Sequence, residues 1–299
     1  MKKLLPLFLV ILLLTACNKN DDDTIRIASA VTTESQILGY ILKDMIEHYT
    51  NEEVVLISNL GSSTVLHQAM VNGDANISSV RYTGTDLMGA LKQEPISDPQ
   101  KALEIVQRLF QEKFNMTFFD SYGFNNTYAF MVTKETADKY QLKTVSDFKS
   151  IAADLEVGVD NSWMNREGDG YKAFGAAYGF NFGRVFPMQI GLVYDAVAQG
   201  ELDAVLGYTT DGRIASYDLV VLEDDLQFFP PYDASPFATN LILEEKPEVK
   251  RVLQLLVGQI SNAEMQRLNF LADNNLIEPR IVAKNFLMEH NYFAGGDTP

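Results

Sequence analysis

The sequence predicts an α/β protein of two lobes that face each other across a ligand cleft. Alternating strand and helix patterns run along the chain twice, and the second run begins at residue 127. Two stretches also resemble each other, "AMVNGDANISSVRYTGTD" at residues 69–86 and "AVAQGELDAVLGYTTDG" at residues 196–212. Each has the pattern of a helix end, a glycine, a buried strand and a Tyr-Thr pair, so we expect each lobe to build the same unit.

The first run is predicted from apolar residues at helical spacing, such as Ile37, Ile41 and Met45, between short apolar runs typical of buried strands. Strands are predicted at 24–30, 53–60 and 75–80, and helices at 35–50 and 64–73. Strands that alternate with helices in this order predict a parallel sheet.

The second run repeats this alternation and is followed by helical patterns up to the C-terminus. Strands are predicted at 127–134, 155–160 and 202–208, and helices at 144–151, 168–180, 191–200, 247–259, 261–275 and 279–290. Between them, "FFPPYDASP" at residues 228–236 is expected to carry the chain back to the first lobe, which makes a hinge of two crossings. The predicted division is 24–124 and 221–299 for lobe 1, and 125–220 for lobe 2.

The N-terminus "MKKLLPLFLVILLLTAC" predicts a signal peptide over residues 1–16, because two lysines precede an apolar run too short to span a membrane. Small residues directly before Cys17 resemble the bacterial lipobox, in which this cysteine is lipidated and becomes the first mature residue. We therefore expect residues 17–23 to be a lipidated cysteine and a flexible polar tether. The predicted location is the extracytoplasmic face of the cell membrane, to which the lipid anchors the protein.

The net charge and the cysteine content of the chain argue against nucleic-acid binding and against thiol chemistry. The chain has 40 acidic and 24 basic side chains, a formal net charge of -16, which repels phosphate backbones and predicts no nucleic-acid partner. Cys17 is the only cysteine. The mature protein is therefore expected to use neither a disulfide nor a thiol nucleophile elsewhere in the chain.

Histidines and serines form no recognisable catalytic or metal-binding pattern. His48, His67 and His290 lie in separate helical patterns without the spacing of metal ligands. Residues Ser146 to Lys149 match Ser-x-x-Lys, but the Lys-Thr-Gly element of that enzyme class lacks its glycine, and Ser146 is more simply a helix N-cap.

Three aspartates near the expected cleft, Asp86, Asp120 and Asp211, could supply a carboxylate pair for acid–base chemistry. Nothing in their spacing singles out two of them, so turn or capping roles are favoured. We therefore expect no catalytic residues, no metal site and no cofactor.

Four tyrosines lie in turn-like sequences, "RYTGTD", "NNTYAF", "GYTTDGR" and "PPYDASP", which contain Tyr82, Tyr128, Tyr208 and Tyr232. Ligands of open α/β sheets bind beyond the carboxyl ends of strands, so Tyr82 and Tyr208 are expected to face each other across the cleft. Tyrosine ring faces attract cations that cannot donate hydrogen bonds, quaternary ammonium groups above all. The pattern predicts an aromatic cage for such a cation.

Longer motifs extend over nearly the whole mature chain, among them "NLGSSTVLHQAM", "RYTGTDL", "FDSYGFNNTYAF", "GDGYKAFGAAYGF", "YTTDGR" and "FFPPYDASP". In these the chain resembles the substrate-binding lipoproteins of osmoprotectant ABC importers, which bind glycine betaine, carnitine and choline. The resemblance implies the type II periplasmic-binding-protein fold and a cage of Tyr82, Tyr128, Tyr208 and Tyr232. It also implies ligand binding by Thr85, since threonine is typical of the broad-specificity members at this position.

One position departs from the family's pattern. A family member with well-matched motifs has a glutamine after its first strand that holds the ligand carboxylate, and this chain has Ala30 there. Thr85 or backbone N–H groups of the "TTES" turn would have to replace that contact. Ligands with a different tail, such as choline or ergothioneine, are therefore alternatives.

The predicted function is osmoprotective uptake, in which the receptor delivers a quaternary ammonium compound to an ABC permease. A separate ATPase is expected to drive transport, because the chain has no Gly-x-x-x-x-Gly-Lys phosphate loop. The alternatives are the same scaffold with ergothioneine or choline alone as cargo, an envelope enzyme that uses the same cleft, and a structural or adhesive lipoprotein.

Overall fold

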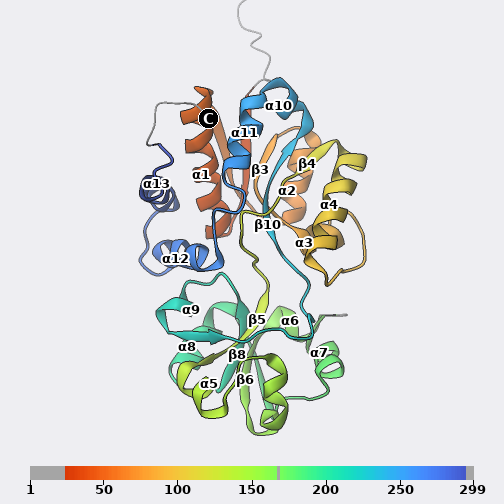
Figure 1. Cartoon of the computed structure of the whole chain (residues 1–299), viewed down its shortest axis with the longest axis vertical. Coiled ribbons are helices and arrows are strands. Elements are labelled where there is room, and N and C mark those ends of the chain that lie inside the picture. The colour runs from red at the N-terminus through yellow and green to blue at the C-terminus, as the bar shows by residue number, and fades with distance from the viewer. Residues whose placement is uncertain (1–23, 167–168, 294–299) are drawn as a thin grey trace, which may run out of the picture.

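The computed structural model describes residues 24–166 and 169–293, which form two α/β lobes, one above the other in Figure 1. The predicted signal peptide, Cys17 and the tether lie outside the described residues. Within the described part of the chain, no helix is long and apolar enough to cross a membrane.

Lobe 1, the upper lobe in Figure 1, contains a five-stranded sheet with the order β2-β1-β3-β10-β4. Its strands are β1 (Ile25–Ala30), β2 (Val54–Leu60), β3 (Ile77–Tyr82), β4 (Met116–Phe118) and β10 (Ala234–Thr239). β1 pairs in parallel with β2 and β3, whereas β10 runs antiparallel to β3 and β4.

Lobe 2 repeats this design with the order β7-β6-β8-β5-β9. Its strands are β5 (Tyr128–Thr133), β6 (Glu156–Asp160), β7 (Arg184–Met188), β8 (Ala204–Tyr208) and β9 (Leu219–Val221). β6 pairs in parallel with β7 and β8, and β5 runs antiparallel to β8 and β9. β3 and β8, the strands of the two similar stretches, therefore hold equivalent places in the two sheets.

The prediction of two α/β lobes is confirmed, but the prediction of a parallel sheet is wrong for one strand in each lobe. β10 and β5 each enter their sheet directly from the other lobe. No crossover helix connects them to a neighbouring strand, so nothing in their connection requires the parallel direction.

Strand β10 was not predicted, because Pro236 lies in its middle and proline is rare in central strands. The register between β10 and β3 shifts between Ser235 and Phe237, so Pro236 occupies a β-bulge. A residue at a bulge leaves the hydrogen-bond ladder, and the missing N–H of proline costs nothing there.

Helices cover both faces of each sheet (Figure 1). In lobe 1 they are α1 (Thr33–Thr50), α2 (Ser63–Asn72), α3 (Thr83–Met88), α4 (Pro99–Phe114), α10 (Asn240–Glu245), α11 (Pro247–Leu255), α12 (Asn262–Asp273) and α13 (Pro279–Glu289). In lobe 2 they are α5 (Lys134–Tyr140), α6 (Asn161–Met164), α7 (Tyr171–Tyr178), α8 (Ile190–Ala198), α9 (Arg213–Ser216) and two 3₁₀ segments, Val145–Ser150 and Ala152–Asp154.

Adjacent residues of the strands pack into cores on opposite faces, as the alternation of a strand requires. In lobe 1, Ile27 packs into the core beneath α1 and α11–α13, and Ala28 packs into the core beneath α2–α4. In lobe 2, Phe130 belongs to a core rich in aromatic rings, and Met131 packs against α8 on the other face. Both lobes thus have complete cores of their own, which leaves the space between them free for a ligand.

Two segments cross between the lobes, residues 119–127 and residues 222–233. They lie side by side, because Asn125 and Asp233 form an antiparallel bridge and Asn126 N donates to Tyr232 O over 3.1 Å. The predicted boundary at residues 124/125 falls in the first crossing and that at 220/221 falls inside β9. The division at those residues stays a prediction.

The lobes also meet where α12 of lobe 1 packs on α9 of lobe 2 (Figure 1). Gln266 Nε2 donates to Thr209 O over 2.8 Å, and Asn269 Nδ2 donates to Thr210 O over 2.9 Å. Gly212 lies directly against α12, since a Cβ there would lie 2.6 Å from the backbone nitrogen of Phe270. Only a residue without a side chain fits this contact.

We expect Gly212→Ala to lower the free energy of unfolding by roughly 1–3 kcal/mol, the usual cost of overpacking a buried contact. Urea unfolding measures this loss. Gly61→Ala is the matched control, because nothing lies within 4 Å of a Cβ at Gly61. Equal stability of both variants would contradict a close α9–α12 contact.

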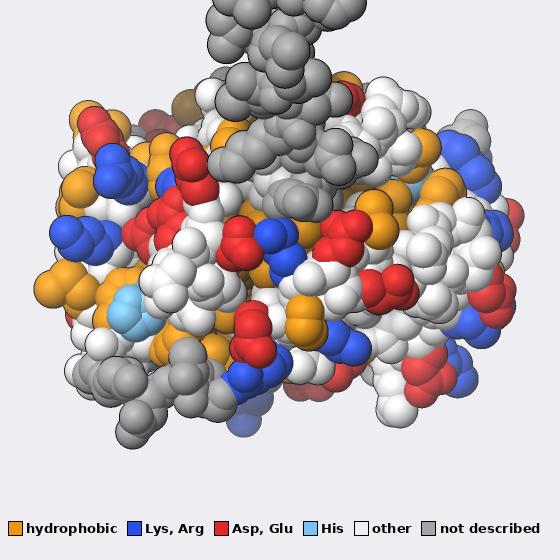
Figure 2. Space-filling model, turned by 90° about the horizontal axis from the view of Figure 1, so that it is seen from above, with side chains coloured by type: hydrophobic (Ala, Val, Ile, Leu, Met, Phe, Trp, Pro, Cys, Tyr) orange, Lys and Arg blue, Asp and Glu red, His pale blue; other side chains and the backbone are white. Residues whose placement is uncertain are grey.

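The end of lobe 1 that faces away from lobe 2 is seen from above in Figure 2. Acidic, basic and apolar side chains are interspersed on it. The described residues visible there form no continuous basic stripe of the kind that phosphate backbones require.

Candidate functional site

A cavity of about 540 Å³ lies between the lobes, within the range of roughly 300–1,000 Å³ typical of small-molecule sites. Lobe 1 contributes the ends of β1 and β3, the starts of α1 and α2, and α3, and lobe 2 contributes the start of β5 and the end of β8. All the predicted ligand-binding residues line this cavity: Tyr82, Thr85, Tyr128, Tyr208 and Tyr232.

Strand ends place three of the tyrosines. Tyr82 and Tyr208 are the last residues of β3 and β8, where ligands of α/β sheets bind. Tyr128, the first residue of β5, lies directly opposite Tyr208 in the antiparallel ladder, so both side chains share a face. Their ring centroids are 4.9 Å apart at an interplanar angle of 36°, and the two rings form an aromatic wall on the lobe 2 side.

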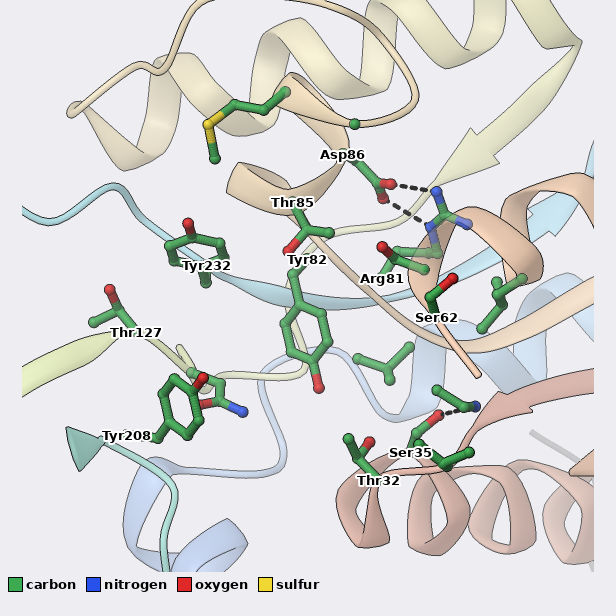
Figure 3. Close-up of a pocket in the computed structure, with 18 of the residues that line it drawn as sticks. Thr32, Ser35, Ser62, Arg81, Tyr82, Thr85, Asp86, Thr127, Tyr208 and Tyr232 are labelled. Atoms are coloured by element: carbon green, nitrogen blue, oxygen red, sulfur yellow. Dashed lines mark hydrogen bonds and ion pairs between the residues drawn. The ribbon is translucent and has the colours of Figure 1, made fainter. Parts of the chain in front are cut away.

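Tyr232 comes from the second crossing and is fixed by contacts with α3. Thr83 Oγ1 donates to Pro231 O over 3.0 Å. The crossing approaches α3 closely because a Cβ at Gly84 would lie 2.7 Å from Pro231 O and 3.1 Å from the Tyr232 ring. Figure 3 shows Tyr82, Tyr208 and Tyr232 around one space, with Thr85 beside them.

Buried carboxylates accept hydrogen bonds from two of the tyrosines. Tyr82 Oη donates to Glu34 Oε1, and Tyr128 Oη donates to Asp160 Oδ2 over 2.6 Å. Burial raises the pKa of the Glu34 carboxyl above its ordinary value, and the hydrogen bond from Tyr82 opposes this. Burial also raises the pKa of both phenols, and the bonds to Glu34 and Asp160 raise it further. Both tyrosines are therefore neutral donors.

One cation, Arg166, reaches two of the cavity's tyrosines. Its guanidinium carbon lies 5.7 Å from the Tyr128 ring centroid, and its Nη2 donates to Tyr232 Oη over 3.3 Å. An ion pair of 2.9 Å with Asp169 holds the side chain, which stays partly exposed. Its position beside the aromatic wall suits a group that meets the anionic part of a ligand.

Ala30 also lines the cavity, at the end of β1. Its methyl group offers no hydrogen bond to a carboxylate. Polar atoms nearby are instead supplied by Thr32 and Ser35 at the start of α1 and by Ser62, the N-cap of α2 (Figure 3). The Ser35 hydroxyl is already used, since it accepts from Ala30 N over 2.8 Å.

The aspartates considered for catalysis have other partners. Asp86 forms a buried ion pair with Arg81, and Asp211 forms a bidentate pair with Arg213 over 2.7 and 2.9 Å. Asp120 accepts from Gln107 over 2.9 Å. Among the residues that the structure describes, no three histidine, cysteine or acidic side chains are grouped as metal ligands would be.

Three residues that shape the site were missed in the sequence: Glu34, Asp160 and Arg166. Asp160 offered a usable signal, because it ends β6, the parallel neighbour of β8, and so lies at the same sheet edge as Tyr208. Glu34 and Arg166 offered none, since no pattern indicated which tyrosines they meet.

The family model described as the substrate binding domain of ABC-type glycine betaine transport systems matches residues 23–289. The chain belongs to this family. The carnitine transport binding protein OpuCC of Listeria monocytogenes is 54% identical, over 98% of this chain and 99% of its own length. A crystal structure of a glycine betaine/carnitine/choline ABC transporter shares 59% identity and a TM-score of 0.88, over 90% of this chain and 99% of its own.

A further relative is the ergothioneine transport permease/ergothioneine binding protein EgtU of Helicobacter pylori (strain G27). It is 32% identical over 95% of this chain and 51% of its own length. The chain is thus a substrate-binding protein of an ABC transport system and not an enzyme, which implies a small ligand and a permease as partners. The predicted family and fold class are confirmed.

Proposed function

We propose that the protein is a lipid-anchored receptor on the extracytoplasmic face of the membrane that binds glycine betaine, carnitine or choline for osmoprotective uptake. Tyr82, Tyr128, Tyr208 and Tyr232 form the cage for the trimethylammonium group, and Thr85 contacts the rest of the ligand. The observation that carries the proposal is that four tyrosines from both lobes and one crossing line a single cavity.

The magnitudes are consistent with this cage. A desolvated cation–π contact contributes about 2 kcal/mol or more, so four rings supply roughly 8 kcal/mol before lobe closure and ligand ordering are subtracted. Micromolar affinity needs about 8 kcal/mol net. The cage therefore needs polar contacts to the other end of the ligand. The ligand stabilises the closed arrangement of the lobes, and the permease binds this closed state.

Arg166 is the residue we propose for that other end, because the methyl group of Ala30 cannot hold a carboxylate. A ligand carboxylate beside the Tyr128–Tyr208 wall gains a charge-assisted bond from the guanidinium. A ligand that carries only a cation meets a second positive charge 5.7 Å from the Tyr128 ring centroid. The site should therefore prefer zwitterions.

Arg166→Gln is expected to weaken glycine betaine and carnitine binding by about 10-fold or more, since a hydrogen bond to a charged group contributes about 1.5–3 kcal/mol. Choline affinity should stay the same or rise. Isothermal titration calorimetry with each ligand measures this change of preference. An equal loss for choline would contradict the assignment of Arg166 to the carboxylate.

A thermal-shift panel with glycine betaine, carnitine, choline, ergothioneine and proline tests the proposed function. A ligand at 100 times its Kd adds about 2.7 kcal/mol to stability, which shifts the melting temperature measurably. Stabilisation by glycine betaine or carnitine, but not by proline, is the expected result. Stabilisation by ergothioneine alone would favour the second cargo, which the H. pylori relative and Ala30 suggest. An unchanged melting temperature with every trimethylammonium compound would contradict the proposal.

A further inference from the structure

Two buried carboxylates lie behind the cavity without a cationic partner. Glu34 of lobe 1 is 4% exposed and Asp160 of lobe 2 is 5% exposed. Within residues 24–166 and 169–293, neither lies within ion-pair distance of a lysine, arginine or histidine. Buried charges in proteins are normally paired, so the described part of the protein leaves these two without their counter-charge.

The two arginines that line the cavity form ion pairs with carboxylates other than Glu34 and Asp160. Arg81 pairs with Asp86, and Arg166 pairs with Asp169. Arg166 lies over the Tyr128 ring and makes no ion pair with Asp160. A cation bound in the cavity would supply the positive charge that no ion pair of the described residues gives Glu34 and Asp160.

Each unpaired carboxylate is connected to the cavity through a phenol. Tyr82 donates to Glu34, and Tyr128 donates to Asp160. Glu34 also accepts from the amides of Asn126 and Asn269, over 3.2 Å each. These donors stabilise the ionised form of Glu34 and oppose the rise in its pKa that burial causes.

We propose that Glu34 and Asp160 are the counter-charges of the ligand's ammonium group and act on it through the rings of Tyr82 and Tyr128. This inference rests on the proposed function, since it assumes a trimethylammonium group in the cage. A phenol that donates to an anion is polarised toward a more negative ring, which strengthens its attraction for a cation. The carboxylates do not touch the ligand and are positioning residues.

The arrangement places one anion in each lobe. A cation between the rings is one phenol away from both carboxylates, and at such a separation in a partly dry site a unit charge changes affinity by about tenfold. Both lobes thus attract the same ligand group, and a ligand with a neutral group of the same shape in place of the ammonium gains nothing from either carboxylate. The site selects charge as well as shape.

Asp160→Asn tests this inference, because the amide oxygen can still accept from Tyr128 while the charge is lost. The ligands are glycine betaine and 3,3-dimethylbutanoate, in which carbon replaces the ammonium nitrogen. We expect glycine betaine to lose about tenfold in affinity. The affinity of 3,3-dimethylbutanoate, measured by competition, should stay the same or rise, because its carboxylate is no longer repelled by Asp160. Glu34→Gln should give the same selective loss from the other lobe.

Asp195→Asn is the matched control. Asp195 also accepts from a tyrosine of lobe 2, Tyr217, over 2.6 Å, but it does not line the cavity. Asp195→Asn removes one negative charge from a carboxylate that accepts the same kind of hydrogen bond, so neither ligand should lose affinity. A loss of glycine betaine binding as large as that of Asp160→Asn would mean that only net charge matters and would overturn the inference.

The melting temperature of the ligand-free variants separates an electrostatic from a structural role. Removing an unpaired buried charge should leave the melting temperature of Asp160→Asn unchanged or raise it. A lowered melting temperature together with equal losses of affinity for both ligands would show a purely structural role and overturn the inference. Unchanged glycine betaine affinity in Asp160→Asn would also overturn it. If the wild-type protein binds no trimethylammonium compound, the proposed function itself is wrong. If the wild type binds glycine betaine and Asp160→Asn binds it equally well, only the role of the carboxylates is wrong.

Discussion

Tyr208→Ala is expected to weaken glycine betaine and carnitine binding at least about 30-fold, because the cage then lacks one desolvated cation–π interaction of about 2 kcal/mol. Tyr208 is chosen because its hydroxyl makes only one side-chain hydrogen bond in the described structure, over 3.4 Å with that of Tyr128. The ring also packs against the lobe 2 core and the Tyr128 ring, so the melting temperature of the ligand-free variant is measured beside its affinity. Titration calorimetry of both proteins measures it.

Tyr140→Ala is the control for this change. Tyr140 ends α5 on the surface of lobe 2, is 38% exposed and does not line the cavity. Its replacement should leave affinity within about twofold of the wild type, since exposed surface changes rarely exceed ±0.5 kcal/mol. Unchanged affinity of the Tyr208→Ala variant would show that Tyr208 is not part of the cage.

Asp86→Ala is expected to lower the free energy of unfolding by about 3–5 kcal/mol, the largest stability loss we predict. Asp86 is 1% exposed and Arg81 is 3% exposed, and Arg81 Nε donates to Asp86 Oδ2 over 2.8 Å. The arginine also lies against the rings of Phe110 and Phe237, 5.7 and 5.2 Å from their centroids. Without Asp86 its charge stays buried and unpaired. Urea unfolding measures the loss.

Glu112→Ala is the matched control for the ion pair. Glu112 pairs with Arg108 over 3.0 Å, but both side chains are more than half exposed. Pairs of this kind contribute about 0.3–0.5 kcal/mol. A similar small loss for Asp86→Ala would show that water reaches Arg81 and that the pair is not structural.

The positions of the tyrosines could be predicted because a sheet has fixed geometry. Tyr82 and Tyr208 end strands with the same sequence surroundings, and the ends of equivalent strands in two facing lobes meet at one cleft. The aspartates of the same two stretches gave a weaker signal. Asp86 and Asp211 each pair with an arginine, but Arg81 lies before its aspartate and Arg213 follows its own.

The groups behind the tyrosines could not be predicted, because their contacts join distant parts of the chain. Glu34 meets Tyr82, Asn126 and Asn269, which lie 48, 92 and 235 residues away. No local period or motif encodes such a cluster. Strand β10 was missed for a different reason, since the bulge that tolerates Pro236 exists only once β10 pairs with β3.

A crystal structure of the protein with glycine betaine or carnitine would show directly whether the four tyrosines form the cage. We expect the ammonium nitrogen within about 6 Å of the ring centroids of Tyr82, Tyr128, Tyr208 and Tyr232, the range of a cation–π contact. The ligand's carboxylate should point toward Arg166 and Thr85. A ligand bound outside this cavity, or bound with its carboxylate in place of its ammonium group inside the ring of tyrosines, would overturn the proposed cage.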